Sequence, residues 1–169
     1  MHRSCWPKEN NNVFLEKLGR RIEHIAGLNA NADKKYSEPY MCGNYGIGGH
    51  YWLHPDFHHP SVEHYRPGSS GNRVATILTV LENADAGGAT VWPYAGISVV
   101  GQKGSALFWH NTYSSDIPDE FTMHVACPVL LGQKWIGNKW VGYNAQWNRR
   151  KCLLSPFDWF RPMREFQQL

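Results

Sequence analysis

Three side chains of this sequence could bind one metal ion, namely those of His54, Asp56 and His124. His54 and Asp56 lie two positions apart, a spacing that puts both side chains on the same face of an extended strand. The third ligand must come from a distant part of the chain. His124 is the best candidate because it lies in a second strand-like run, with Lys134 beyond it. Two histidines and one carboxylate with open coordination positions are the ligand set of non-haem Fe(II) oxygenases.

Two other interpretations of these residues stay open at this point. A His-x-Asp pair on its own more often belongs to a solvated loop than to a metal site, and Pro55 between the two is compatible with such a loop. The same three ligands would also suit catalytic zinc, which keeps one open position. A second metal site could be formed by three nearby histidines, His58, His59 and His64, but we interpret them as a histidine-rich surface loop.

One amphipathic helix is predicted upstream of these residues. Asn11 and Asn12 are suited to the N-cap position, and Gly27 supplies a stop signal. Apolar residues recur between them at helical spacing, at Phe14, Leu18, Ile22 and Ile25. The Arg20 and Arg21 side chains are expected on the face of the helix that meets water.

After a loop at 34–39, helical spacing gives way to short strands separated by Gly, Pro and Asn turns. One strand ends near Tyr45, and further strands are predicted at 74–81, 89–92, 97–100, 105–110, 123–129 and 139–143. Apolar residues occupy both faces of the 74–81 strand, so we expect both faces to be at least half buried. Short strands at this spacing predict a mainly β, two-sheet jelly roll.

The composition indicates a single domain with a sizeable core. The chain has 169 residues, of which 42% are hydrophobic and 18% are charged. The formal net charge of +3 is too small and too scattered to indicate nucleic-acid binding. No apolar stretch is long enough to cross a bilayer, and residues 1–12 lack the charged start and apolar centre of a signal peptide. Taken alone, these features predict a cytosolic protein.

The residues around the candidate ligands carry a family resemblance. The relevant stretches are 44–49, 71–76, 87–91, 103–109 and 124–140. In that order and at those spacings they resemble the catalytic domain of the collagen prolyl 4-hydroxylase alpha subunit, a family of Fe(II)/2-oxoglutarate dioxygenases. The resemblance runs from Trp6 to Cys152, so we expect one catalytic domain at 1–152 and a tail at 153–169 that has no counterpart in the family.

The resemblance implies a fold, a reaction and a ligand set. The fold would be the double-stranded β-helix form of the jelly roll, with the amphipathic helix packed on it. Fe(II) would be bound by His54, Asp56 and His124, and L-ascorbate would keep the iron reduced. The cosubstrate 2-oxoglutarate would pair its far carboxylate with Lys134, a charge-assisted contact, and would meet the hydroxyl groups of Tyr45 and Thr90. The reaction would be procollagen-proline 4-hydroxylation in X-Pro-Gly sequences, which consumes O2 and releases succinate and CO2.

The resemblance also implies binding partners and a location. Tyr51, Arg73 and Trp140 match positions that bind a proline-rich, collagen-like peptide, and aromatic grooves suit a polyproline II chain. Cys127 and Cys152 would form an intrachain disulfide in the lumen of the endoplasmic reticulum, with protein disulfide isomerase as a possible beta subunit. Because the amino-terminal regions of the family have no counterpart here, we expect this chain to be a fragment of a longer protein.

Several positions depart from the family pattern. His50, Trp52, Leu53 and Pro55 replace the usual residues around the iron ligands, and Gly142 stands where the family has a histidine. We expect Gly142 to weaken the coupling between 2-oxoglutarate consumption and hydroxylation. These changes leave a second hypothesis open, a weakened or non-enzymatic module that binds proline-rich peptides with the same fold.

Overall fold

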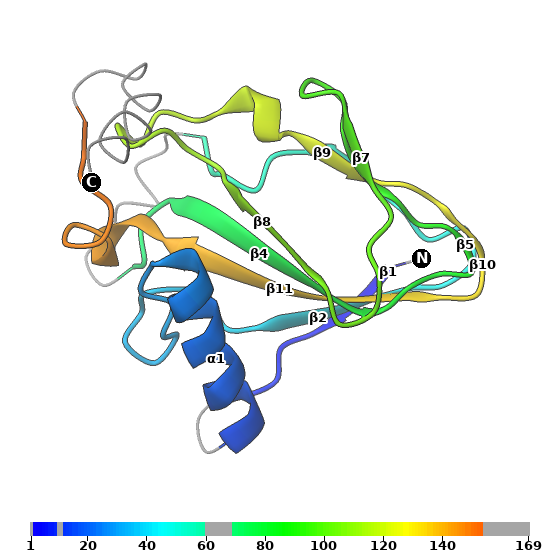
Figure 1. Cartoon of the computed structure of the whole chain (residues 1–169), viewed down its shortest axis with the longest axis horizontal. Coiled ribbons are helices and arrows are strands. Elements are labelled where there is room, and N and C mark those ends of the chain that lie inside the picture. The colour runs from blue at the N-terminus through cyan, green and yellow to red at the C-terminus, as the bar shows by residue number, and fades with distance from the viewer. Residues whose placement is uncertain (1, 10–11, 60–68, 154–169) are drawn as a thin grey trace, which may run out of the picture.

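A five-stranded antiparallel sheet forms the larger layer of the molecule (Figure 1). The computed structural model describes residues 2–9, 12–59 and 69–153. In spatial order the strands of this sheet are β1 (His2–Cys5), β2 (Met41–Tyr45), β11 (Lys134–Gly142), β4 (Arg73–Glu82) and β8 (Ala106–His110). Strand β4 is buried on both faces, as its apolar sequence predicted, because one face meets the second sheet and the other meets the helix.

A four-stranded antiparallel sheet faces the larger one and carries two of the candidate ligands. Its strands are, in spatial order, β3 (Tyr51–His54), β9 (His124–Ala126), β6 (Thr90–Trp92) and β7 (Ile97–Val99). At the end of the molecule where the two sheets approach each other, β5 (Ala86–Gly87) pairs with β10 (Val129–Leu131), as Figure 1 shows. Two short 3-10 helices are η1 (Glu120–Thr122) and η2 (Tyr143–Ala145). The predicted mainly β, two-sheet fold is therefore confirmed.

The apolar core between the sheets is made by residues from both layers. Its buried members are Tyr45, Leu78, Val80, Ala84, Ala126, Val129 and Ile136. Because all of these side chains except Ala84, which lies in the loop after β4, come from β2, β4, β9, β10 and β11, the core joins the strands that surround the candidate site.

The predicted amphipathic helix is α1 (Val13–Ala26), which packs on the outer face of the larger sheet (Figure 1). Asn12 caps it by accepting hydrogen bonds from the backbone N–H groups of Phe14 and Leu15, a cap that typically stabilises a helix by about 1 kcal/mol. Gly27 ends it with a left-handed φ of 66°. Both predicted termini are thus confirmed.

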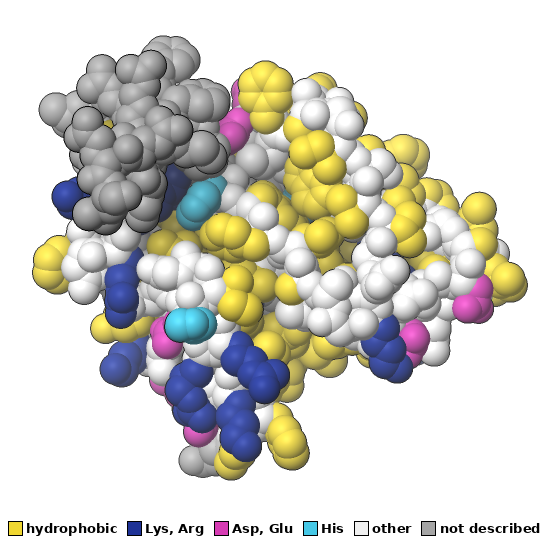
Figure 2. Space-filling model, viewed as in Figure 1, with side chains coloured by type: hydrophobic (Ala, Val, Ile, Leu, Met, Phe, Trp, Pro, Cys, Tyr) yellow, Lys and Arg dark blue, Asp and Glu magenta, His cyan; other side chains and the backbone are white. Residues whose placement is uncertain are grey.

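The face that α1 buries differs slightly from the predicted one. Its contacts with the sheet come from Leu15, Leu18, Ile22 and Ala26, whereas Phe14 and Ile25 point to solvent. The opposite face is basic, and Figure 2 shows the Lys and Arg side chains gathered over α1. The predicted exposure of Arg20 and Arg21 is confirmed. Within the described ranges, no helix has the length and apolar composition that a bilayer-spanning segment requires.

Three strands differ from the sequence prediction for identifiable reasons. Strand β11 begins at Lys134, five residues before the predicted start at residue 139. The prediction missed its first part because Gly137 resembles a turn residue. In the structure Gly137 lies within the strand, where the Tyr40 ring would overlap any side chain. The predicted strand at 123–129 is interrupted after Ala126, and its final residue belongs to β10. Strand β1 was not predicted at all, and it pairs along the free edge of β2.

Candidate active site

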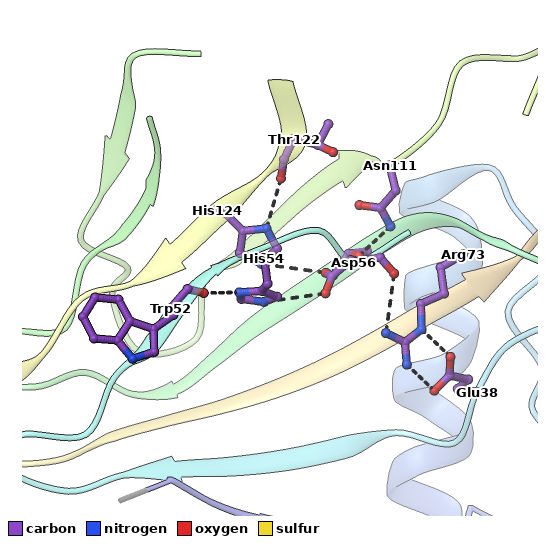
Figure 3. Close-up of polar contacts among 9 residues, drawn as sticks. Glu38, Trp52, His54, Asp56, Arg73, Asn111, Thr122 and His124 are labelled. Carbon is purple, nitrogen blue, oxygen red and sulfur yellow. Dashed lines mark hydrogen bonds and ion pairs between the residues drawn. The ribbon is translucent and has the colours of Figure 1, made fainter. Parts of the chain in front are cut away.

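The pairing of β3 with β9 brings two distant histidines together. His54 and His124 are direct cross-strand partners, and their ring centroids lie 4.3 Å apart. Asp56 follows two residues after the end of β3, and its carboxylate oxygens lie 4.0 Å from Nε2 of His54 and 3.9 Å from Nε2 of His124. One ligand atom from each residue lies within 4.8 Å of the others, so a single ion could contact all three (Figure 3).

Both histidines are oriented by backbone carbonyl groups. Nδ1 of His54 lies 2.6 Å from the carbonyl oxygen of Trp52, and Nδ1 of His124 lies 3.0 Å from that of Thr122. A carbonyl oxygen only accepts, so each Nδ1 carries the proton and each Nε2 keeps a lone pair that a cation beside Asp56 could accept. Burial, followed by the charge of the neighbouring His124, lowers the pKa of His54, which favours the neutral, ligating form.

A chain of hydrogen bonds holds the Asp56 carboxylate in place. Oγ1 of Thr76 donates to Oδ2 of Asp56 at 2.7 Å, and Nδ2 of Asn111 donates to Oγ1 of Thr76 at 2.9 Å. Thr76 and Asn111 are completely buried, and both were missed in the sequence because a threonine or an asparagine near a strand has many ordinary uses. For Thr76, the available signal was a polar residue among the apolar ones on one face of β4.

The donor set fits a divalent cation. Asp56 is 4% exposed, and among the described residues its carboxylate forms no ion pair with a lysine or an arginine. A buried carboxylate whose charged-group neighbours are two imidazoles is costly unless a cation compensates it. Two imidazole nitrogens and one carboxylate oxygen on a common side match the ligand set of non-haem iron sites.

Lys134 and Thr90 form a second polar cluster within the jelly roll. Nζ of Lys134 donates to the carbonyl oxygen of Gly88 at 2.7 Å and to Oγ1 of Thr90 at 3.1 Å, and it lies 5.9 Å from the centre of the Tyr45 ring. Burial lowers the pKa of Lys134 to about 8. In the part of the chain that the structure describes, Nζ has no carboxylate partner, so this buried ammonium is suited to an anionic ligand.

Tyr45 connects the lysine cluster to the metal ligands. Its ring faces Lys134, and the same residue lines a cavity of about 320 Å³ together with His54 and Asp56. Burial, and secondarily the nearby Tyr51 and Asp56, raises the pKa of Tyr45 to about 12, so its phenol keeps its proton at neutral pH. The predicted grouping of Tyr45, Thr90 and Lys134 is therefore present as geometry.

All three predicted peptide-binding residues line this cavity. Tyr51 and Arg73 contribute to its walls together with Trp140, and Trp6 and Asn138 add to them. The Oδ1 atom of Asn138 and the Nε1 atom of Trp140 are buried and make no hydrogen bond within the structure. Both residues line the cavity, but these two polar atoms lie beneath its surface, so among the described residues they are buried without a partner.

Two further contacts of this wall were not predicted. Arg73 forms an ion pair with Glu38, in which Nη2 lies 2.8 Å from Oε2 of the carboxylate, and its guanidinium lies 4.1 Å from the centre of the Trp140 ring (Figure 3 shows the ion pair). Trp6 packs against the Trp140 ring at 5.8 Å between centroids. Neither Glu38 nor Trp6 carries a sequence signal for this role, since both depend on long-range packing.

The remaining predicted residues lie as follows. The thiols of Cys127 and Cys152 are free, as are those of Cys5 and Cys42, so their predicted disulfide stays a prediction for oxidised protein. A side chain at Gly142 would collide with the backbone of Ser70, so this position has no room for the family histidine. His58 pairs with Asn72 through its backbone, whereas His64 and residues 154–169 of the tail lie outside the described residues.

Comparison with known proteins identifies the class. Residues 40–142 match the model of the 2OG-Fe(II) oxygenase superfamily, and the chain belongs to this family. Among individual relatives, it is 39% identical over 157 residues to prolyl 4-hydroxylase subunit alpha-1 and 43% identical over 159 residues to subunit alpha-3, both from Homo sapiens. These matches cover 92% of this chain but 29% and 28% of the two relatives, so the chain spans less than a third of their length.

The fold is also found in a solved viral structure. The viral collagen prolyl hydroxylase of Paramecium Bursaria Chlorella virus-1 superposes with a TM-score of 0.70 and 21% sequence identity, over 83% of this chain and 79% of the viral one. This likeness supports the jelly-roll architecture.

Proposed function

We propose that this chain is the catalytic domain of a procollagen-proline 4-dioxygenase. It hydroxylates peptidyl proline in collagen-like X-Pro-Gly sequences with Fe(II), O2 and 2-oxoglutarate, and releases succinate and CO2. The observation that carries the proposal is the combination of two buried sites in one jelly roll: the His54, Asp56 and His124 cluster, and the ammonium of Lys134, which has no carboxylate partner among the described residues. The identity with the prolyl 4-hydroxylase alpha subunits supports the choice of reaction.

The protein's own residues have distinct roles in this reaction. His54, Asp56 and His124 hold the iron, which supplies the oxidising chemistry when it is bound. Lys134 pairs with the far carboxylate of 2-oxoglutarate, while the hydroxyl groups of Thr90 and Tyr45 hydrogen bond to the cosubstrate. Trp92 and Trp109, whose rings lie 5.8 and 5.1 Å from that of His124, exclude water from this side of the iron ligands.

The cavity wall fits a proline-rich peptide. A polyproline II chain has few N–H donors and presents rings and carbonyl groups. The aromatic faces of Tyr51 and Trp140 suit these rings. Arg73 positions Trp140 by stacking on it while Glu38 holds the guanidinium.

A second candidate function is peptide binding without efficient turnover. The observation that favours it is the close approach of Ser70 to Gly142, which leaves no room for the donor that the family carries there. A zinc enzyme is disfavoured, because a hydrolytic zinc site has no use for a buried ammonium beside it. By resemblance to the alpha subunits, we also propose L-ascorbate as reductant, protein disulfide isomerase as partner, and the endoplasmic reticulum lumen as location.

The test is direct hydroxylation of a Pro-Pro-Gly repeat peptide. The chain is incubated with Fe(II), ascorbate, O2 and 2-oxoglutarate, and the peptide is examined by mass spectrometry for one added oxygen atom per modified proline. His124→Ala is the matched inactive control, and His24→Ala, on the exposed face of α1, should behave as the parent chain. Peptide binding without any hydroxyproline would favour the second candidate, and zinc-dependent peptide cleavage would contradict both.

A further inference from the structure

Strands β1 and β2 place two cysteines directly opposite each other. In the antiparallel register of these strands, Cys5 is the partner of Cys42. Opposite residues of an antiparallel pair share one face of the sheet, with Cα atoms about 4.5 or 5.5 Å apart. Both separations fall within the roughly 4.4–6.8 Å that a disulfide spans, so the backbone needs no rearrangement to join these two residues.

The two thiols influence each other across the strand pair. Burial, followed by the influence of the adjacent Cys5 thiol, raises the pKa of Cys42. Cys5 is exposed, whereas Cys42 is partly buried and packs against the core beneath α1. An external oxidant can therefore react with Cys5 first, and Cys42 lies opposite Cys5, where it can act as the resolving cysteine.

We propose that Cys5 and Cys42 are a site of reversible disulfide formation, with a small-molecule disulfide such as glutathione disulfide as oxidant. The Cys5 thiolate attacks one sulfur of the oxidant and releases one glutathione thiol, which leaves Cys5 in a mixed disulfide. The Cys42 thiolate then attacks the Cys5 sulfur and releases the second glutathione. The protein loses two protons and two electrons, and the oxidant takes up both to become two thiols.

The bond would fasten the edge of the sheet beside the active-site cavity. Strand β1 is the outermost strand of its sheet, and it is followed directly by Trp6. Ser4 and Trp6 line the cavity, and Trp6 packs on Trp140. Because edge strands fray most readily, a covalent link at Cys5 holds this cavity wall in position, and reduction releases it.

Cysteine mapping tests the proposal without any need for turnover. Its result therefore does not depend on whether the proposed function is correct. The full chain is incubated with glutathione disulfide, its free thiols are blocked with N-ethylmaleimide, and it is digested without reduction. We expect a monomer in which the Cys5 peptide is joined to the Cys42 peptide, with about 2 Da lost from the pair. A chain carrying Cys127→Ser and Cys152→Ser should give the same linked peptides, because it retains only this pair.

Amide hydrogen exchange measures the structural consequence. Residues 2–6 should exchange more slowly in the oxidised chain than in the reduced one, and Cys5→Ser should remove that difference. Two blocked thiols at Cys5 and Cys42 after oxidation of the parent chain would overturn the site, as would a Cys5 that pairs with Cys127 or Cys152 instead. Linked peptides with unchanged exchange at residues 2–6 would overturn the fastening of the cavity wall.

Discussion

The metal-ligand end of the cavity and its peptide-facing wall are built in different ways. At the ligand end, Asp56 and His124 are buried, and their polar atoms are held by Thr76 and by a backbone carbonyl. At the wall, the Tyr51 side chain is 48% exposed and that of Trp6 is 49% exposed. The first region is organised before any ligand arrives, whereas the second combines a fixed part, Trp140 held by Arg73, with these exposed rings, which a bound peptide would cover. Substitutions at the ligand end should therefore remove chemistry, and those at the wall should change peptide affinity.

The largest effect is expected from a lost metal ligand. His124→Ala, and equally His54→Ala or Asp56→Ala, should abolish turnover because a three-residue ligand set has no spare member. The measurement is succinate formation together with iron content after desalting. His24→Ala serves as the control, and a ligand variant with full activity would break the assignment of this end.

Lys134→Ala should weaken the binding of 2-oxoglutarate more than the binding of the peptide. A hydrogen bond to a charged group contributes about 1.5–3 kcal/mol, which corresponds to a rise in KM for 2-oxoglutarate of roughly 10- to 150-fold. Lys103→Ala, at an exposed lysine that pairs with Glu82, is the matched control. Steady-state kinetics with both substrates varied decide the matter, since an equal rise in both KM values would make Lys134 a general structural residue.

The same lysine predicts a pH dependence. Burial lowers the pKa of Lys134 to about 8, so the ammonium is present below that pH and is lost as the pH rises through it. The KM for 2-oxoglutarate should therefore rise about tenfold between about pH 7 and about pH 9. In Lys134→Ala this segment of the profile should be flat, and a parent-like rise in the variant would assign the titration to another group.

Thr76→Val tests how the ligand end is held in place. The substitution keeps the shape of the side chain but removes the hydrogen bond to Asp56 and leaves the Asn111 amide without its acceptor. Loss of such a partner typically lowers metal affinity by about 10- to 100-fold, which titration of the chain with Fe(II) under anaerobic conditions would measure. Thr76→Ser should recover most of the affinity, and an unchanged dissociation constant in Thr76→Val would show that Asp56 needs no partner.

The smallest effect is expected at the wall. Trp6 lines the cavity, so Trp6→Ala should remove one aromatic contact with the peptide; such a contact contributes about 0.5–1.5 kcal/mol, and the KM for the peptide should rise roughly 2- to 13-fold. The KM for 2-oxoglutarate should not change. Trp147→Ala, at a tryptophan that is largely exposed, is the control. A Trp6 variant that lost turnover altogether would contradict the claim that wall residues affect peptide affinity and not the chemical step.

The residues that sequence reasoning found are those with distinctive chemistry. His54, Asp56 and His124 form a recognisable ligand set, although the His-x-Asp pair alone would suit a loop, and the resemblance of the flanking stretches favoured the metal site and gave Lys134 its role. Thr76, Asn111 and Glu38 act through their place in the packed structure, which composition and spacing do not reveal. The same holds for Trp6, whose position depends on β1, a short strand of polar residues formed only by pairing with the edge of β2.

At Gly142 the sequence revealed only part of what the structure shows. The sequence shows the absence of the family histidine, but only the structure shows that the Ser70 backbone occupies the space that a side chain would need. Gly142→His would therefore strain the 69–71 segment as well as supply a donor. Its effect on coupling remains a prediction that must be measured alongside the stability of the variant.

Strand β11 fixes the distance between the cosubstrate site and the peptide-facing wall. It begins at Lys134, where the cosubstrate carboxylate is expected, and it carries Trp140 of the peptide wall six positions later. At about 3.3 Å per residue, the strand sets a separation of roughly 20 Å between these Cα positions. An insertion or deletion within β11 would change that length and reverse the faces of all later side chains. Length variation among relatives should therefore collect in the loops outside this strand, while the spacing from Lys134 to Trp140 stays fixed.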